Sequence, residues 1–400
     1  MLRRAFFPLL MSGASFLSAA DPAWRHLSTS NGDLSPPGAA VEQTAAVVGD
    51  FDGDGLNDFV IGMRRVAPAV VWYRRRADGW DRQVIEPEML RVEAGGAVYD
   101  IDGDGDSDVV FGGDGTSDEL WWWENPFPHF ATDAPWKRHG IKKGGGKAHH
   151  DQVFADLKGT GRPQLVFWNQ QVKKIFLAEI PADPRQAESW PYAEIYDAAR
   201  DGTTNKPEGM AVCDVDGDGR PDLLAGMHWF KHVAGNEFSA IQVADRPGRI
   251  GAGRFKPGKT AQIVLAPGDV TGPIRIYECD GNPENPADWR GRDLLDREMI
   301  HGHSLQVVDV DGDGNLDIFS AEMAKWGRAA TVENPGATAW IWYGDGRGNF
   351  RRTVFQTGFG FHEAKVADLD GDGRMDVLSK PYTWEAPRLD IWLQLPAARK

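Results

Sequence analysis

The sequence predicts an all-β protein, a seven-bladed β-propeller of four-stranded blades that is closed by its N-terminal strand. Two observations carry this prediction. The nine-residue pattern D-x-D-G-D-G-x-x-D occurs five times in 400 residues, and two degenerate copies fill the two widest gaps between the intact ones. Short apolar and aromatic segments, separated by turn residues, flank the copies, and no segment of useful length has helical periodicity. Four-stranded units repeated around an axis form a propeller.

Each unit contains four predicted strands. An apolar strand precedes the loop and another follows it, as at residues 46–49 and 59–62 of the first unit. The third strand is rich in aromatic residues, at 70–73, 120–123, 274–277 and 340–343. The fourth strand joins a tryptophan to an isoleucine, at 80–85, 136–141 and 190–195. We expect the aromatic side chains to pack between blades rather than to bind sugars.

The two ends of the chain predict how the ring closes. The last unit stops after a third strand at residues 389–395, whereas the chain begins with an unpaired fourth strand at 24–28. We expect the N-terminal strand to complete the last blade, because this pairing removes an exposed sheet edge.

The intact loops predict calcium sites. Four aspartates within nine residues repel one another unless a cation lies between them, and oxygen ligands on a short loop suit Ca²⁺. The glycines at the fourth and sixth positions let the backbone curl around an ion. We therefore expect about five calcium sites. Their side-chain ligands are Asp50, Asp52, Asp54 and Asp58; Asp100, Asp102, Asp104 and Asp108; Asp214, Asp216, Asp218 and Asp222; Asp309, Asp311, Asp313 and Asp317; and Asp368, Asp370, Asp372 and Asp376.

The degenerate loops span residues 156–164 and 254–262. In both, a lysine (Lys158 or Lys256) replaces the second aspartate and a glutamine replaces the last. We expect these two loops to need no ion, since the lysine supplies a positive charge of its own.

The net charge and the N-terminal segment limit the partners and the cellular location that the sequence allows. The formal charge of −15 excludes the basic surface that nucleic acid requires, and most of the acidity belongs to the loops. Arg3 and Arg4 precede an apolar run at 5–17 and then small residues, which predicts a signal peptide at residues 1–20 and one propeller domain at 21–400. The run is shorter than the ~20 residues that span a bilayer. We expect a secreted or periplasmic protein with no membrane insertion after signal cleavage.

The repeat also locates a candidate site in the central channel. The residue six positions before each loop should begin the innermost strand, at one level around the axis. These residues are Thr44, Ala94, His150, Glu208, Gly248, His303 and His362. Imidazole and carboxylate ligands suit a transition metal such as Zn²⁺ better than Ca²⁺. We therefore predict a site for Zn²⁺ or another divalent transition metal, held by His150, Glu208, His303 and His362. The alternative is a polar channel that only binds water.

Neighbouring residues are candidates for acid and base catalysis. His149 and His301 are positioned to accept a proton, and Glu363 and Tyr382 to protonate a leaving oxygen. The second strand of each blade returns to the same face, which places Tyr382 near the channel.

The aspartate-rich loops with flanking apolar strands resemble the FG-GAP/VCBS repeat family over essentially the whole mature chain. Three further segments, 149–152, 302–306 and 362–364, together with the aromatic stretch 120–126, are similar to the propeller part of aldos-2-ulose dehydratase and related bacterial exported proteins. This resemblance implies metal-assisted removal of water from a keto-sugar, with a carbohydrate as substrate.

Three functions follow from these observations. The first is an exported, metal-dependent lyase or dehydratase that acts by elimination on a sugar, keto-sugar or polysaccharide. The second is a non-catalytic, calcium-stabilised propeller that binds carbohydrate or protein on the same face. The third is a structural scaffold, which leaves the ring of histidines unexplained.

Overall fold

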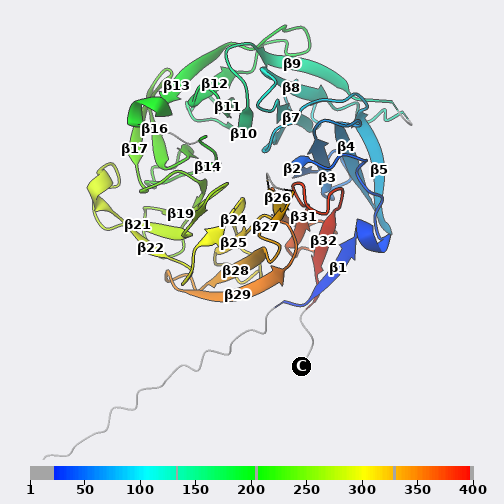
Figure 1. Cartoon of the computed structure of the whole chain (residues 1–400). Helices are drawn as coiled ribbons and strands as arrows, with labels where there is room; N and C mark the ends of the chain where they lie inside the picture. The colour runs from blue at the N-terminus through cyan, green and yellow to red at the C-terminus, as the bar shows by residue number, and fades with distance from the viewer. Residues whose placement is uncertain (1–21, 132–133, 203–205, 328–329, 397–400) are drawn as a thin grey trace, which may run out of the picture.

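The computed structural model describes residues 22–131, 134–202, 206–327 and 330–396. Within these residues, seven four-stranded sheets surround a central axis (Figure 1). The predicted seven-bladed propeller is therefore confirmed. The predicted signal peptide lies outside the described residues.

The first four blades follow the chain from the inner strand to the outer strand. Blade 1 comprises β2 (Gln43–Gly49), β3 (Asp58–Met63), β4 (Val70–Arg76) and β5 (Gly79–Glu86). Blade 2 comprises β6 (Ala97–Tyr99), β7 (Asp108–Gly112), β8 (Glu119–Glu124) and β9 (Lys137–Lys143). Blade 3 comprises β10 (His149–Ala155), β11 (Gln164–Asn169), β12 (Lys174–Glu179) and β13 (Tyr192–Asp197). Blade 4 comprises β14 (Met210–Cys213), β15 (Asp222–Ala225), β16 (His228–Ala234) and β17 (Glu237–Gln242).

The last three blades complete the circle. Blade 5 comprises β18 (Arg249–Gly253), β19 (Gln262–Ala266), β21 (Arg275–Cys279) and β22 (Trp289–Asp293). Blade 6 comprises β24 (Ser304–Val308), β25 (Asp317–Ala321), β28 (Thr338–Gly344) and β29 (Phe350–Thr357). Blade 7 comprises β30 (Lys365–Ala367), β31 (Asp376–Ser379), β32 (Asp390–Gln394) and the N-terminal strand β1 (Trp24–Ser28).

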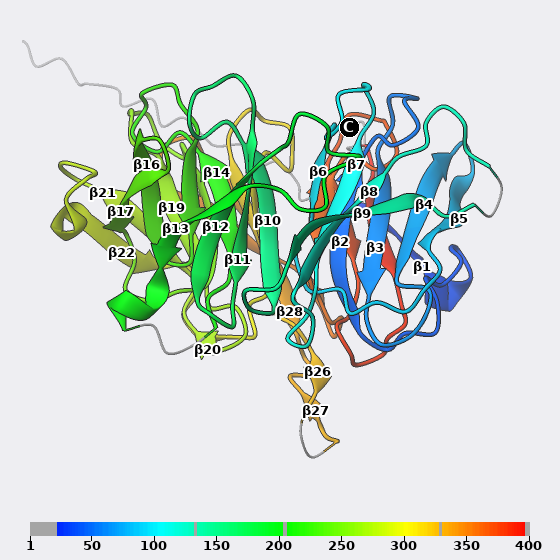
Figure 2. The ribbon, with the colours of Figure 1, turned by 90° about the horizontal axis from the view of Figure 1, so that it is seen from above.

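Short strand pairs and 3-10 helices lie outside the four-stranded blades. Strand β20 (Thr271–Gly272) pairs with β23 (Met299–Ile300), and β26 (Lys325–Trp326) pairs with β27 (Val332–Glu333). Figure 2 shows the β26–β27 hairpin projecting from one face of the disc. The short 3-10 helices are η1 (Thr29–Asn31), η2 (Ala198–Asp201) and η3 (Pro286–Asp288). Among the described residues, none of the helices has the length and apolarity that crossing a membrane requires.

The core lies between neighbouring blades. Trp72 of β4 and Trp123 of β8 are fully buried in one apolar cluster that joins blades 1 and 2, and Trp342 of β28 helps to join blades 5 and 6. Burial of each large apolar side chain contributes about 1.5–3 kcal/mol. The expectation that the third-strand aromatic residues pack between blades is confirmed.

The N-terminal strand closes the ring. Strand β1 pairs antiparallel with β32, from Trp24 opposite Gln394 to Ser28 opposite Asp390. The His26 ring stacks on Trp392 at 4.7 Å, and its Nε2 lies 2.9 Å from the Asp390 carboxylate. The predicted closure is confirmed, and in Figure 1 the two ends of the described chain meet in this blade.

Closure through β1 predicts a difference between two substitutions on that strand. Leu27 is buried in the cluster between blades 1 and 7, whereas Arg25 is exposed. We expect Leu27→Ala to lower the free energy of unfolding by about 2–4 kcal/mol, because it leaves a cavity at the seam. The control Arg25→Ala should change it by no more than about 0.5 kcal/mol. Denaturant unfolding measures both values, and equal effects of the two variants would contradict this role for β1.

Candidate functional site

The aspartate-rich loops connect the first and second strands of their blades at one face of the disc. In the first loop, carboxylate oxygens of Asp50, Asp52 and Asp54 lie within 4.8 Å of one another, and the loops at residues 100–108, 214–222 and 309–317 contain similar groups. The backbone N–H of Gly55 donates to Asp50 at 2.9 Å, and Gly53 and Gly55 have φ values of +68° and +86°. The glycines thus allow the predicted curl, and the clustered oxygens fit a hard cation.

The last aspartate of each intact loop has a second role that the sequence did not reveal. Asp108 is fully buried, and its two oxygens accept hydrogen bonds of 2.9 Å from the backbone N–H groups of Ile101 and Asn125. It therefore ties the loop to the end of the third strand. In the degenerate loop of blade 5, Gln262 accepts the corresponding bond from Phe255 N–H at 2.9 Å. Glutamine keeps this connection without a charge.

Three of the four predicted channel ligands converge at the opposite ends of the inner strands. His150 lies in β10, Glu208 precedes β14 and His303 precedes β24, and all three are buried. One ligand atom from each lies within 4.8 Å of the others. The Glu208 Oε2 atom is 3.1 Å from His303 Nε2 and 3.9 Å from His150 Nε2. We call these three residues the His-Glu cluster.

The fourth predicted ligand, His362, joins the cluster through His303. The two imidazole rings stack with centroids 4.5 Å apart and an interplanar angle of 19°. The Nδ1 atom of His362 lies 3.2 Å from the Lys380 amine, which also donates to the backbone carbonyls of His362 and Gln43. Burial, together with the Lys380 charge, holds the pKa of His362 well below its usual value. One of its ring nitrogens therefore already has a polar partner.

A second layer of charges holds the two histidines of the cluster. His150 Nδ1 is 2.6 Å from Asp151 Oδ2, and His303 Nδ1 is 3.6 Å from Glu363 Oε1. Arg249 bridges the two carboxylates, with nitrogen–oxygen distances of 2.7 Å to Asp151 and 2.9 Å to Glu363. Each histidine therefore turns Nδ1 toward a fixed carboxylate and Nε2 toward Glu208, an arrangement that orients metal-binding histidines.

Irregular backbone conformations determine the orientation of the Asp151 and Glu363 side chains. The β10–β11 register shifts between His150 and Gln152, so that Asp151 bulges out of the ladder with φ at +45°. Glu363, which follows His362, has φ at +53°. Left-handed conformations are unfavourable for residues with a side chain and concentrate at functional sites. Both outer carboxylates thus depend on a strained backbone next to a ring histidine.

The protonation states of Glu363 and His150 depend on their charged neighbours. Burial disfavours the ionised form of Glu363, but Arg249 overrides it and lowers the pKa of Glu363 to about 2. Burial likewise opposes protonation of His150, but the Asp151 carboxylate raises the pKa of His150 to about 9. Glu363 is therefore an anion at neutral pH, which does not suit the proton-donor role that the sequence suggested for it.

The remaining predicted residues lie in different places. His149 is buried between blades 2 and 3, near Lys142 and Phe167, and burial lowers its pKa to about 3. His301 has its Nδ1 2.7 Å from the Asp269 carbonyl. The backbone N–H of Asp269 in turn donates to Glu208 at 2.7 Å, which connects His301 to the His-Glu cluster.

Tyr382 adjoins the cluster from blade 7. Its ring stacks on His362 with centroids 4.7 Å apart, and burial raises the pKa of its hydroxyl. Tyr382 therefore keeps its proton at neutral pH and lies one ring away from His303.

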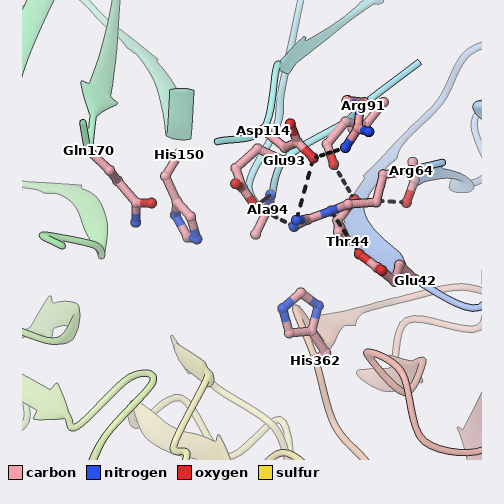
Figure 3. A network of polar contacts seen from close by, with 12 residues as sticks. Glu42, Thr44, Arg64, Arg91, Glu93, Ala94, Asp114, His150, Gln170 and His362 are labelled. Atoms are coloured by element: carbon pink, nitrogen blue, oxygen red, sulfur yellow. Dashed lines mark hydrogen bonds and ion pairs between the residues drawn. The ribbon is translucent and has the colours of Figure 1, made fainter. Parts of the chain in front are cut away.

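A charged network on the other side of the channel was not expected from the sequence. Arg64 pairs with Glu93 at 2.6 Å, and with Glu42 and Asp114 at 3.6 and 3.7 Å. Figure 3 shows His150 and His362 pointing from opposite sides toward the region in front of Arg64. These residues face the channel because their strands begin or end at the same level as the ring positions.

A cavity of about 230 Å³ adjoins the His-Glu cluster at Glu208, the one cluster residue that lines it. Gln170, Lys206 and Asp269 supply further polar lining. Asp269 Oδ1 also approaches His303 Nε2 at 3.7 Å. The buried donor set of two imidazoles and one carboxylate fits a divalent transition metal.

Comparison with known proteins agrees with this architecture. Residues 309–379 match the model of the FG-GAP-like repeat. No curated protein matches the chain. A structure of BBS1N in complex with ARL6DN, soaked with mercury, has a TM-score of 0.54 and 12% sequence identity, and the alignment covers 94% of this chain and 99% of that one. For YCF48 from Cyanidioschyzon merolae the TM-score is 0.50 at 12% identity, with coverage of 92% and 98%.

At such low identity these structural similarities concern the fold alone. Together with the repeat match and the seven blades, they identify the chain as a seven-bladed β-propeller that carries the FG-GAP-like repeat from its sixth into its seventh blade.

Proposed function

We propose that this protein is an exported, metal-dependent carbon–oxygen lyase, a dehydratase that acts on a sugar or keto-sugar. The observation that carries the proposal is the orientation of two buried histidines. Both direct Nε2 toward the oxygen of Glu208, and both have Nδ1 on the side of a carboxylate that Arg249 bridges, Asp151 at 2.6 Å from His150 and Glu363 at 3.6 Å from His303. Proteins build metal centres in this way, and a donor set of two histidines and one carboxylate leaves positions open for substrate.

The chemistry divides between the bound ion and the surrounding side chains. A divalent metal held by His150, Glu208 and His303 would stabilise the negative charge that develops on a substrate carbonyl oxygen. We assign proton abstraction to His301: its Nδ1 donates to the Asp269 carbonyl, so Nε2, which lies 3.3 Å from Glu333, is the nitrogen that would accept the proton. We assign protonation of the departing hydroxyl to Tyr382, which retains its proton and lies beside His362.

The choice of a sugar substrate rests on the resemblance of three segments to the dehydratase propeller. The cavity beside Glu208 also has Gln170, Lys206 and Asp269 among its lining residues, and these polar groups suit a ligand rich in hydroxyl groups. A non-catalytic carbohydrate-binding or protein-binding propeller would use the same face but would hold no transition metal.

We also propose that the five intact loops bind Ca²⁺ and stabilise the fold. The clustered carboxylates and the positive-φ glycines support this assignment. An ion that binds only to the folded state raises its stability by mass action.

Metal analysis tests the proposed lyase most directly. We expect elemental analysis of the purified protein to find about one transition-metal ion and about five calcium ions per chain. His303→Ala should lose the transition metal and keep its calcium and its circular dichroism spectrum, because the ring contacts of His303 are with the channel residues His150 and His362 and not with the cores between the blades. His232→Ala, on the outer part of blade 4, is the matched control and should keep both metals. A transition metal that persists in His303→Ala would refute the assigned ligands.

The bridge made by Arg249 predicts a graded effect on metal affinity. Arg249→Gln should weaken transition-metal binding about 10-fold to 100-fold, because Asp151 and Glu363 lose the charge that fixes them. Arg249→Lys should retain part of the affinity. Competition with a chromophoric chelator measures the change, and Arg254→Gln at the exposed loop of blade 5 serves as the control. Equal affinity in the wild type and in Arg249→Gln would show that the bridge does not position the ligands.

The amount by which calcium stabilises the fold should vary with pH. Burial raises the pKa of the last loop aspartate to about 7 in Asp58, about 8 in Asp108 and about 6 in Asp376. The unfolded value is ~3.9. The ion-free folded state therefore retains protons that the unfolded state releases, so its stability falls as pH rises from about 4 to about 8.

Added calcium needs the ionised carboxylates, so it should restore more stability at pH 8 than at pH 5. The measurement compares melting temperatures of calcium-free protein with and without added CaCl₂ at both pH values. A calcium-induced rise in melting temperature that is absent, or the same at pH 5 and pH 8, would contradict the assignment.

A further inference from the structure

A second cavity lies beside the channel, at the seam between blades 6, 7 and 1. Its volume is about 680 Å³. Three aromatic side chains line it: Trp326 from the β26–β27 hairpin, and Tyr382 and Trp384 from the loop after β31. Glu42, Arg65, Thr383 and Glu385 supply polar groups. Its size is typical of small-ligand sites.

Contacts from both strands tie the base of the β26–β27 hairpin to its surroundings. The backbone N–H of Trp326 donates to Thr383 Oγ1 at 2.9 Å, and Glu333 of β27 lies 3.3 Å from His301 Nε2. Trp326 is nevertheless 51% exposed, and it is the one exposed tryptophan in the described part of the chain. A single exposed indole is common, but here it shares one cavity with the Tyr382 and Trp384 rings, and such a group of aromatic side chains is typical of a binding surface.

Two stacked rings separate the cavity from the proposed metal centre. The Tyr382 ring, which lines it, stacks on His362 at 4.7 Å, and His362 stacks on His303 at 4.5 Å. The wall of this cavity therefore contacts His362 through the Tyr382 ring, and His362 in turn contacts the His-Glu cluster.

The charges around the cavity indicate the class of ligand. Arg65 already pairs with Glu42 at 2.6 Å, and Arg388 pairs with Glu385. No uncompensated cation therefore lines the described part of the wall to hold an anion. Flat indole and phenol faces contact the C–H face of a sugar ring, while carboxylates and a threonine hydroxyl accept and donate hydrogen bonds at its rim.

We propose that this cavity is a binding subsite for a pyranose ring of a neutral carbohydrate, with Trp326 and Trp384 as its stacking surfaces. Sugar binding in this cavity does not depend on the proposed lyase function. Only the further clause, that the sugar bound here belongs to the substrate of the proposed lyase, rests on the proposed function.

Calorimetric titration with cellotriose, maltotriose and xylotriose tests the subsite, with calcium present and the transition metal removed. We expect at least one of these trisaccharides to bind to the wild type. Trp326→Ala and Trp384→Ala should each weaken that binding at least about 10-fold, since each removes a stacking surface. Tyr192→Ala, an exposed aromatic residue on blade 3, is the control and should leave the affinity unchanged.

Two outcomes would overturn the subsite: binding of none of the three sugars, or equal affinity in the wild type and in both tryptophan variants. Tighter binding of trigalacturonate than of any neutral trisaccharide would overturn the assigned ligand class. His303→Ala separates this proposal from the lyase, because it should retain the sugar affinity while losing the transition metal. Sugar binding in a protein that never holds a transition metal would reject the lyase and leave the subsite standing.

Discussion

Closure of the ring is the constraint on which the rest of the structure depends. Strand β1 pairs with β32, so blades formed at the two ends of the chain are fixed next to each other. The inner strands then face one axis at one level, and residues as distant in sequence as His150 and His362 both come into ring contact with His303. No local interaction along the chain could bring these imidazoles together. The site is thus a product of the repeat geometry, and the seam at β1 maintains it.

The carboxylates of the loops and those of the channel have different electrostatic surroundings. On the loop face they cluster with their charges only partly compensated, and burial of the last aspartate raises its pKa, so a bound cation would relieve the repulsion. At the channel, Arg249 and the histidines surround Asp151 and Glu363, and the pKa of Glu363 falls to about 2. Paired anions of this second kind can hold histidines in one orientation at any physiological pH. The loops suit a hard ion, whereas the channel suits a softer one.

The sequence was sufficient for the blade count, the closure and the convergence of the cluster, because all three follow from a repeat of fixed length. Spacing alone could not locate Arg249, since the ring position of blade 5 is Gly248 and the functional side chain is one residue further on. Asp151 reaches the channel only through a bulge, which a regular strand does not predict. Strand alternation did contain one unused signal: adjacent residues point to opposite sides, so His149 could not share the channel with His150.

The inner strands connect the face of the disc that carries the channel residues to the face that carries the aspartate-rich loops. In blades 6 and 7 a short strand, β24 or β30, separates a channel histidine from the first aspartate of an intact loop. Calcium in these loops would stiffen the strands that carry His303 and His362. His150 and Arg249 stand instead on blades 3 and 5, whose degenerate loops carry lysine and glutamine. In blade 5 the Gln262 side chain accepts the bond from Phe255 N–H that an aspartate accepts in the intact loops. Two of the five channel residues, His150 and Arg249, therefore stand on blades whose loops we expect to need no calcium, whereas Glu208, His303 and His362 stand on blades with intact loops. If the intact loops bind calcium, its loss should loosen the Glu208–His303–His362 side of the channel first.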